Sequence, residues 1–389
     1  MNRTADAPLI YLVACEPSGD VLGGSLMHAI AKETGGRVRF AGVGGPAMTK
    51  AGLDTLFDPS ELALLGIFEV LPKALLVLRR VRETVADIEC VKPSILVTID
   101  SWGFTGRIHQ RLARAQHDVP RVRYVAPQVW AWRPGRARQL AKWIHRVLTL
   151  FPFEPKYFEV AGLPATWVGH PVIESGAGKG DGAKFRTAHA INDGMPVVCV
   201  LPGSRKGEVS RLLPIFRETL KIAAAKLSKF QIVIPTVPAM EALVKSEVSR
   251  WPWPAIIVVT PEARDDAFAA SRAALAASGT VTLELALAKV PHVIAYRVNA
   301  LSALAFRMLA KTKSVNLINI LLGRPVIAER LQGDCRPEIL AEDLVSLVND
   351  DQARAAMLKA FKEAISTLSP ADGPPSRAAA RAVLAMIAP

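Results

Sequence analysis

The chain has 389 residues, of which 50% are hydrophobic and 21% are charged. This length predicts two domains rather than one core, and the composition excludes a disordered chain. The formal net charge of +13 favours an anionic membrane or a phosphorylated substrate. It does not favour nucleic acid, because the sequence has no zinc-finger spacing, helix-turn-helix pattern or aromatic RNA-binding signature.

The first half of the chain alternates short aliphatic runs with spacers of helix length. We expect strands at 8–14, 37–43, 95–99, 122–125 and 147–150. A helix is expected from about residue 21 to residue 32, with Asp20 as its cap. Such alternation is typical of a parallel sheet with right-handed crossovers.

The second half repeats this alternation after a Gly-rich stretch. Strands are expected at 197–201, 232–235, 255–259, 273–276 and 293–296. We therefore expect an α/β protein with two Rossmann-like, doubly wound domains facing across a cleft. The expected parts are a first domain at 1–174, a linker at 175–195, a second domain at 196–365, and a C-terminal loop and helix at 366–389 that can cross back to the first domain.

The cysteines and the N-terminal stretch both indicate a cytoplasmic protein. Cys15, Cys90, Cys199 and Cys335 have no paired spacing, which is typical of reduced thiols. The N-terminal apolar stretch is short and runs into Glu16, which argues against a signal peptide. No apolar run reaches the roughly 18 residues that a membrane span needs.

Two glycine turns in the second half indicate a phosphate site. They are Leu201-Pro202-Gly203-Ser204-Arg205 and Ala277-Ser278-Gly279-Thr280. Each turn ends an expected strand and opens an expected helix, where backbone N–H groups and the helix dipole favour an anion. The guanidinium of Arg205 suits a diphosphate, although a surface ion pair with Glu208 is the alternative.

Side chains near these turns extend the prediction to a nucleotide diphosphate. Glu284, one helical turn beyond Gly279, is placed to accept hydrogen bonds from ribose hydroxyls, or is simply a solvent-facing residue. The hydroxyls of Ser204 and Ser278 either donate to the phosphates or serve the turns themselves.

Two acidic residues of the first half follow expected strands. Asp100 ends the strand at 95–99, where a carboxylate faces the ligand crevice as a general base or else caps a helix. Glu16 lies beside the turn Ser18-Gly19-Asp20 after the first expected strand and is a candidate for contact with an acceptor sugar.

Taken together, the motifs of the chain resemble the lipid-A-disaccharide synthase family of two-Rossmann-domain (GT-B) glycosyltransferases. About 320 residues match in collinear order. The matching stretches, besides the two glycine turns, are 16–20, 42–46, 61–71, 124–133, 151–154 and 168–171, followed by Asn319, Glu329 and Gln332.

This resemblance implies an inverting transfer without a cofactor or a metal ion. The 6-hydroxyl of 2,3-diacylglucosamine 1-phosphate attacks the anomeric carbon of UDP-2,3-diacylglucosamine, UDP leaves, and a β-1,6 disaccharide of the lipid A pathway forms. Asp100 is then the base and Glu16 an acceptor-side residue. The implied UDP-sugar ligands are Gly203, Ser204, Arg205, Ser278, Gly279, Thr280, Glu284, Asn319, Glu329 and Gln332.

The sequence departs from the family pattern close to these residues. Cys15 stands in place of a glycine, and Ile318 in place of a proline. Trp102 and Thr105 stand where the family usually has a proline and an asparagine. These departures leave the donor turns intact and concern the acceptor side.

Residues 63–78 are densely aliphatic and are followed by arginines, which indicates an interfacial helix rather than a buried one. The candidate membrane contacts are Leu64, Leu65, Phe68, Leu75 and Leu76. A basic stretch at 133–146 is either a second anionic contact or a solvated helix face. We expect peripheral attachment to the cytoplasmic face of the inner membrane in a Gram-negative-type bacterium.

Two other kinds of function fit the same pattern. One is another GT-B enzyme that uses UDP-N-acetylglucosamine, either a glycosyltransferase with a different acceptor or an epimerase. The second is a non-catalytic scaffold that binds nucleotide or lipid, against which the joint presence of Asp100, Arg205 and Glu284 argues. A dehydrogenase is disfavoured because the turn at 15–20, after the first expected strand, lacks the spaced Gly-x-Gly-x-x-Gly pattern.

Overall fold

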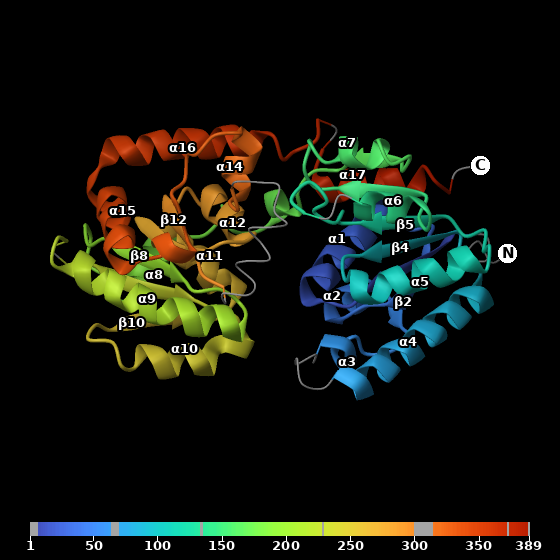
Figure 1. The fold of residues 1–389 in the computed structure, drawn as a ribbon, viewed down its shortest axis with the longest axis horizontal. Coiled ribbons are helices and arrows are strands. Elements are labelled where there is room, and N and C mark those ends of the chain that lie inside the picture. Colours follow the sequence, from blue (N-terminus) through green and yellow to red (C-terminus); the bar gives the residue numbers. More distant parts are fainter. Residues whose placement is uncertain are drawn as a thin grey trace. The chain divides into compact units, whose positions relative to one another are not determined.

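The computed structural model describes residues 7–63, 70–132, 135–227, 229–298, 314–371 and 373–387 (Figure 1). The chain divides into two compact units, Met1–Pro171 with Leu368–Pro389, and Val172–Thr367. Each unit contains one parallel sheet, so the predicted α/β class with two Rossmann-like sheets is confirmed. The C-terminal segment belongs to the first unit, so the last helix does return to it.

The sheet of the first unit has the strand order β3-β2-β1-β4-β5-β6-β7. Its order reverses between β1 and β4, which lie side by side. The strands are β1 (Leu9–Ala14), β2 (Arg39–Val43), β3 (Asp54–Thr55), β4 (Ile95–Ile99), β5 (Arg121–Tyr124), β6 (Arg146–Thr149) and β7 (Ala165–Trp167).

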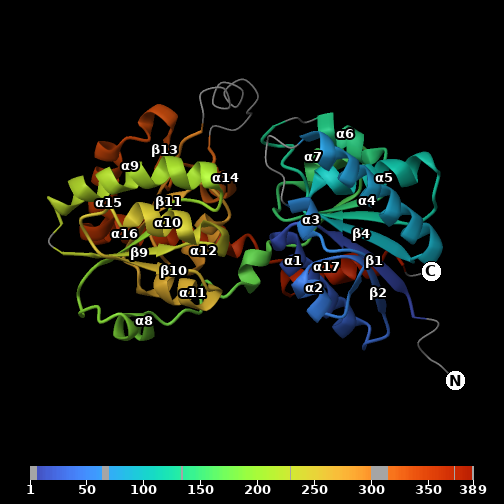
Figure 2. The same ribbon diagram turned by 90° about the horizontal axis from the view of Figure 1, so that it is seen from below.

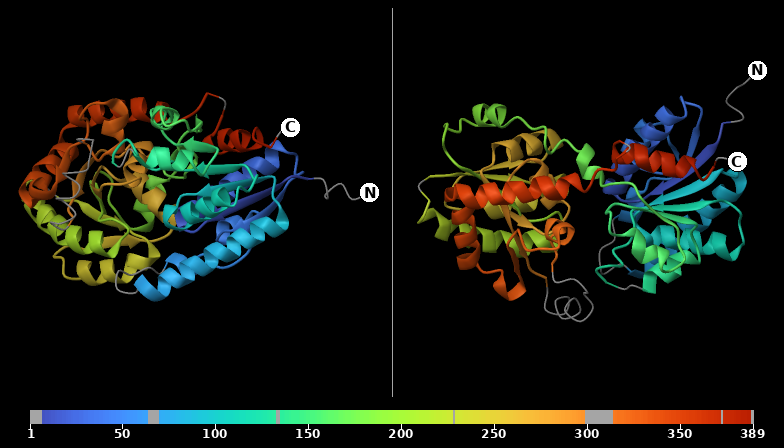
Figure 3. Two further views of the ribbon diagram at one scale, coloured as in Figure 1. Left: turned by 45° about the vertical axis from the view of Figure 1, so that its right-hand side comes forward. Right: turned by 90° about the horizontal axis from the view of Figure 1, so that it is seen from above.

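Helices cover both faces of this sheet, since alternate side chains of β1 and β4 point to opposite sides. Helices α1 and α17 lie on one face, while α4 and α5 lie on the other (Figure 2). Ile10 and Leu12 belong to the core on the side of α1 and α17, and Tyr11 and Val13 to the core on the side of α4 and α5. Helix α17 lies against α1 (Figure 3). The helices are α1 (Pro17–Glu33), α2 (Pro46–Lys50), α3 (Ser60–Ala63), α4 (Val70–Val91), α5 (Trp102–Arg114), α6 (Gly135–Ala141), α7 (Pro155–Glu159) and α17 (Pro375–Leu384).

The sheet of the second unit has the order β10-β9-β8-β11-β12-β13 and reverses between β8 and β11. The strands are β8 (Val197–Leu201), β9 (Gln231–Pro235), β10 (Ala255–Val258), β11 (Ala273–Ala277), β12 (His292–Tyr296) and β13 (Glu329–Leu331). Every side chain of β8 and β11 is buried, as their unbroken apolar sequences predict.

The helices of the second unit include a segment that we expected as linker. Residues 175–195 contain α8, which packs on α11, and the Asp181 N–H donates to the Asp266 carboxylate at 2.7 Å. The helices are α8 (Gly182–Ala188), α9 (Lys206–Ala224), α10 (Glu241–Val248), α11 (Pro261–Ala270), α12 (Val281–Leu287), α14 (Leu317–Leu322), α15 (Pro337–Asn349) and α16 (Asp351–Ser366).

Candidate active site

The two acidic candidates of the first unit meet at the point where its sheet reverses. Glu16 follows β1 and Asp100 follows β4, and these strands pair with Ala14 opposite Ile99. The Ser101 hydroxyl donates to Glu16 Oε1 at 3.2 Å and so links the two strand ends. Ligands of open parallel sheets bind beside such a reversal, at the carboxyl ends of the strands.

The backbone at Asp100 has an uncommon conformation. Asp100 and Ser101 have φ angles of 49° and 45°, in the left-handed region that residues with a side chain rarely adopt. The Thr105 hydroxyl donates to the carbonyl oxygens of Asp100 at 2.9 Å and Ser101 at 3.1 Å. The Asp100 side chain remains 46% exposed. This turn therefore directs a solvent-accessible carboxylate outward from the end of a buried strand.

Asp20 does not cap the helix that follows it, contrary to our expectation. Helix α1 already begins at Pro17, so Asp20 lies within its first turn. Its carboxylate accepts hydrogen bonds from Ala47 N–H at 2.8 Å and Met48 N–H at 3.0 Å, and therefore caps the start of α2.

The two glycine turns of the second unit also lie at a sheet reversal. They follow β8 and β11, which pair with Leu201 opposite Ala276. Gly203 has a φ of 108°, and a Cβ there would lie 2.6 Å from the carboxylate of Glu208, so only glycine fits. Gly279 has open space around it, and Gly279 and Thr280 are exposed. The fold thus brings both predicted phosphate turns to one edge.

Arg205 makes the ion pair that the sequence offered as an alternative. Its Nη1 lies 3.1 Å from Glu208 Oε1, while its side chain is 81% exposed. The other oxygen of Glu208 accepts from the Ser204 N–H at 3.3 Å. The Glu208 carboxylate thus contacts both the Arg205 guanidinium and the Ser204 N–H, two groups that are able to bind an anion. Because the guanidinium is largely exposed to water, such a pair contributes only about 0–1 kcal/mol.

The other candidates near these turns have partners within the unit. The Ser278 hydroxyl donates to the Val315 carbonyl at 3.1 Å. Glu284, on the first turn of α12, lies 3.5 Å from Arg264 Nη1. Burial raises the pKa of Glu284, although the neighbouring Arg264 opposes that shift.

Asn319 and Glu329 form one hydrogen-bond network. The Asn319 side chain donates to the Ile327 carbonyl at 2.9 Å and to Glu329 Oε1 at 2.7 Å, and it accepts from Val326 N–H and Ile327 N–H. Glu329 also accepts from Val315 N–H at 2.8 Å. Gln332 follows β13 with a φ of 49°. Asn319 therefore orients the Glu329 carboxylate and the segment before β13.

Of the candidate membrane contacts, Leu64, Leu65 and Phe68 lie outside the described residues. Leu75 is 71% exposed on α4, whereas Leu76 packs against the core. No helix in the described part of the chain is long and apolar enough to span a bilayer. Within the same ranges, no three His, Cys, Asp or Glu side chains cluster closely enough to hold a metal ion.

Sequence reasoning missed Arg123, which lies beside Asp100. Arg123 is only 1% exposed, in strand β5, and its Nη1 donates to the Asp100 carbonyl at 3.1 Å. The available signal was the alternation of Arg121 and Arg123 within an otherwise apolar strand. A buried arginine is uncommon unless it has a partner, so that alternation indicated an acidic neighbour.

The sequence of the chain matches a known protein family over most of its length. Residues 10–371 match the family model described as lipid-A-disaccharide synthetase. A lipid-A-disaccharide synthase from Rhodospirillum centenum is 50% identical over 379 residues, which cover 97% of this chain and 94% of the relative.

Solved structures of two enzyme types share the fold. UDP-GlcNAc 2-epimerase from Neisseria meningitidis bound to UDP-GlcNAc has a TM-score of 0.59 at 11% identity, covering 92% of this chain and 98% of that one. The calicheamicin glycosyltransferase CalG4 has a TM-score of 0.61 at 17% identity, covering 99% and 100%. At these identities the likeness concerns the fold alone, so the fold does not separate an epimerase from a glycosyltransferase.

Proposed function

This chain belongs to the lipid-A-disaccharide synthase family, and we propose that it catalyses the disaccharide-forming step itself. It transfers 2,3-diacylglucosamine from UDP-2,3-diacylglucosamine to 2,3-diacylglucosamine 1-phosphate with inversion. The observation that carries this proposal is the kind of charged side chain found where the strand order of each sheet reverses. One has an exposed carboxylate on a constrained turn, and the other has a guanidinium beside two glycine turns.

Asp100 acts as the general base in this reaction. The acceptor 6-hydroxyl must lose its proton as its oxygen attacks the anomeric carbon, and a positioned carboxylate accelerates such a step about 10²- to 10⁴-fold. Asp100 suits this role because its side chain is accessible, while Thr105 and Arg123 both donate hydrogen bonds to its backbone carbonyl. Glu16, which is exposed and hydrogen-bonded to Ser101, contacts a hydroxyl of the acceptor sugar.

The second unit holds the UDP. The diphosphate displaces Glu208 from Arg205 and from the Ser204 N–H, at the N-terminus of the 19-residue helix α9. Gly203 keeps that turn tight, and Ser278, Gly279 and Thr280 line the adjacent turn. Positive charge at this position stabilises the leaving UDP.

Acidic and amide side chains complete the donor site. Glu284 accepts hydrogen bonds from the ribose, for which its partly exposed position on the first turn of α12 is suited. Glu329, oriented by Asn319, and Gln332 contact the nucleoside diphosphate sugar from the loop around β13. The assignment of these last three residues rests on the family resemblance.

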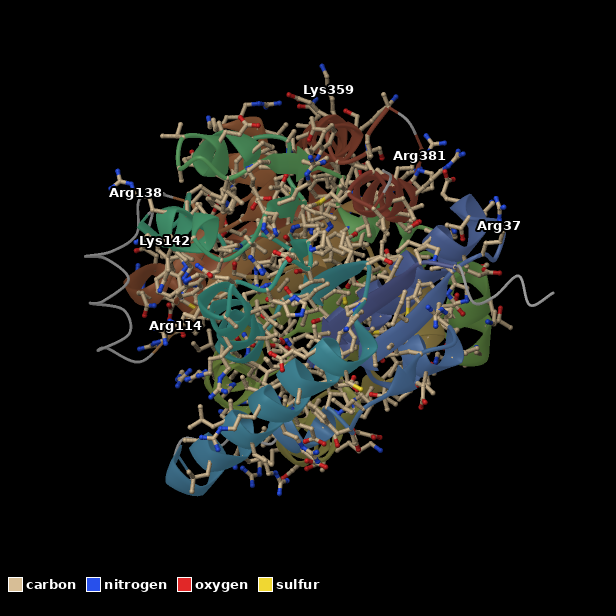
Figure 4. All side chains as sticks on the ribbon, turned by 90° about the vertical axis from the view of Figure 1, so that its right-hand side faces the viewer. Arg37, Arg114, Arg138, Lys142, Lys359 and Arg381 are labelled. Atoms are coloured by element: carbon tan, nitrogen blue, oxygen red, sulfur yellow. The ribbon has the colours of Figure 1, made fainter. Side chains whose placement is uncertain are left out.

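Lipid substrates require access to a membrane, and we propose that α4 provides it on the cytoplasmic face of the inner membrane. Leu75, Leu78, Arg79 and Arg82 are all exposed and recur at helical spacing, so they share one face of α4. Arg114, Arg138 and Lys142 gather on another part of the same unit (Figure 4). Apolar and basic side chains on one helix face favour an anionic bilayer surface.

The test is a mass-spectrometric product assay with synthetic donor and acceptor. We expect a diacylated disaccharide 1-phosphate and UDP only when both lipids are present. The rate should be unchanged by a chelator, because Arg205 supplies the positive charge. Incubation with UDP-N-acetylglucosamine alone is the control for the epimerase alternative. Formation of an epimer there, without disaccharide from the two lipids, would overturn the proposal.

A further inference from the structure

Arg123 is a buried charge near the middle of a parallel sheet. It belongs to β5, pairs with Thr98 of β4, and is 1% exposed. Burial lowers the pKa of its guanidinium to about 10, and the charge of Asp100 opposes that shift. A charge in such a position costs free energy unless partners compensate it, so its contacts reveal its role.

The guanidinium contacts Asp100 and the first turn of α5, which follows it. Nη1 donates to the Asp100 carbonyl at 3.1 Å and to Thr105 Oγ1 at 3.2 Å, and Nη2 lies 3.8 Å from Asp100 Oδ1. The guanidinium also lies over the Trp102 ring, 5.0 Å from its centroid. Trp102 in turn stacks on Trp143 at 5.8 Å.

This arrangement differs from an ordinary structural ion pair. In a structural pair both charges are buried and meet closely, whereas the Asp100 side chain is 46% exposed and 3.8 Å away. The shorter bonds of Arg123 go to the Asp100 backbone and to Thr105. A left-handed conformation at a residue with a side chain is strained and persists only where neighbours impose it.

We propose that Arg123 is a positioning residue for the transfer reaction. It holds the Asp100 carbonyl, together with Thr105, and so fixes the turn from which the carboxylate meets the acceptor hydroxyl. It also places a positive charge behind that carboxylate, which keeps the carboxylate oriented without covering it. This inference rests on the proposed function, in which Asp100 is the base.

The test compares two buried arginines of the same strand. Arg123→Met removes the proposed positioning charge. Arg121→Met is the matched control, because Arg121 is 7% exposed but donates to the carbonyls of Trp143 and His117 rather than to Asp100. Readouts are kcat, KM for the acceptor, UDP affinity and the melting temperature.

For Arg123→Met we expect kcat to fall about 10- to 100-fold, which lies within the range of coupling between contacting residues. UDP affinity and acceptor KM should be nearly unchanged. Arg123→Lys should retain more activity than Arg123→Met, because it keeps the charge and loses only the forked geometry. For Arg121→Met we expect a lower melting temperature with kcat preserved.

Thr105→Val keeps the inference testable if Arg123→Met does not fold, since it removes the second donor to the Asp100 carbonyl and leaves the Arg123 charge in place. A severalfold lower kcat in Thr105→Val and Arg123→Lys supports the inference. Wild-type kcat in both, or an equal loss of kcat in Arg121→Met, overturns it. Asp100→Asn separates the two proposals, because wild-type kcat in that variant means that the proposed base is wrong, whatever Arg123 does.

Discussion

Glu208 occupies the two groups that a diphosphate would need, the Arg205 guanidinium and the Ser204 N–H. We predict that Glu208→Gln binds UDP more tightly, by up to about fivefold, because breaking an ion pair with an exposed guanidinium costs about 1 kcal/mol or less. Isothermal titration with UDP measures this. Glu218→Gln, which removes a carboxylate paired with Arg217 on the same helix, is the control. Weaker UDP binding by Glu208→Gln would mean that the carboxylate is itself a ligand contact.

His292 makes stability depend on pH in the second unit. It is fully buried on β12, and burial lowers its pKa to about 4. In the unfolded chain this histidine binds a proton near pH 6.5, whereas in the folded chain it stays neutral down to about pH 4. The free energy of unfolding is therefore unaffected by His292 above pH 6.5 and decreases as the pH falls from 6.5 to 4. The full loss is about 3 kcal/mol.

Substitution of this histidine isolates its contribution. His292→Gln should lower stability at pH 7.5 but flatten its fall toward pH 4, as urea denaturation at several pH values would show. His189→Gln replaces an exposed histidine and should leave the slope unchanged. An unaltered slope in His292→Gln would refute this assignment.

Residue roles that depend on distant partners were the least predictable from sequence. The strand-end positions of Asp100 and Arg205 followed from local pattern, because a polar residue after an apolar run marks the edge of a parallel sheet. Arg123 lies 23 residues from Asp100 and reaches it only through the pairing of β4 with β5. Asp20 caps α2 rather than its own helix for the same reason, since its partners come from a separate element.

Among the elements, α17 shows how a short C-terminal helix is held. Ala379, Ala380 and Val383 are buried against α1 and the sheet, while Arg377 and Arg381 pair with Glu33 at the surface. We predict that Val383→Ala costs about 2 kcal/mol, because two buried methyl groups are lost. Glu33→Gln should cost clearly less, since exposed pairs contribute little. Urea denaturation measures both, and an inverted order would contradict this account.

Element prediction was reliable wherever periodicity and turns agreed. The expected strands at 95–99 and 197–201 coincide with β4 and β8, because unbroken apolar runs between turn residues fit buried strands. The stretch 175–195 reads locally as a linker because of its glycines. Its short helix α8 and its bond to Asp266 arise from packing that local composition does not encode.

For the whole molecule, net charge and one helix face predict attachment to membranes. We expect the protein to float with anionic vesicles at low salt and to be released at high salt, because basic residues contribute about 1 kcal/mol each near such a surface. Leu75→Ser with Leu78→Ser should reduce the bound fraction while preserving the melting temperature, since both side chains are exposed.

The buried side of the same helix provides the control for this experiment. Val81 is fully buried, so Val81→Ser should lower the melting temperature rather than act on vesicle binding. Protein that stays unbound at low salt, or a double serine variant that floats like the wild type, would contradict peripheral attachment through α4.

The most direct test of the account measures turnover and UDP affinity in two variants, Asp100→Asn in the first unit and Arg205→Met in the second. We predict that Asp100→Asn loses at least about 100-fold in turnover while binding UDP normally. Arg205→Met should bind UDP about tenfold or more weakly, because a charge-assisted contact is lost. Wild-type turnover in Asp100→Asn, or wild-type UDP affinity in Arg205→Met, would contradict the account.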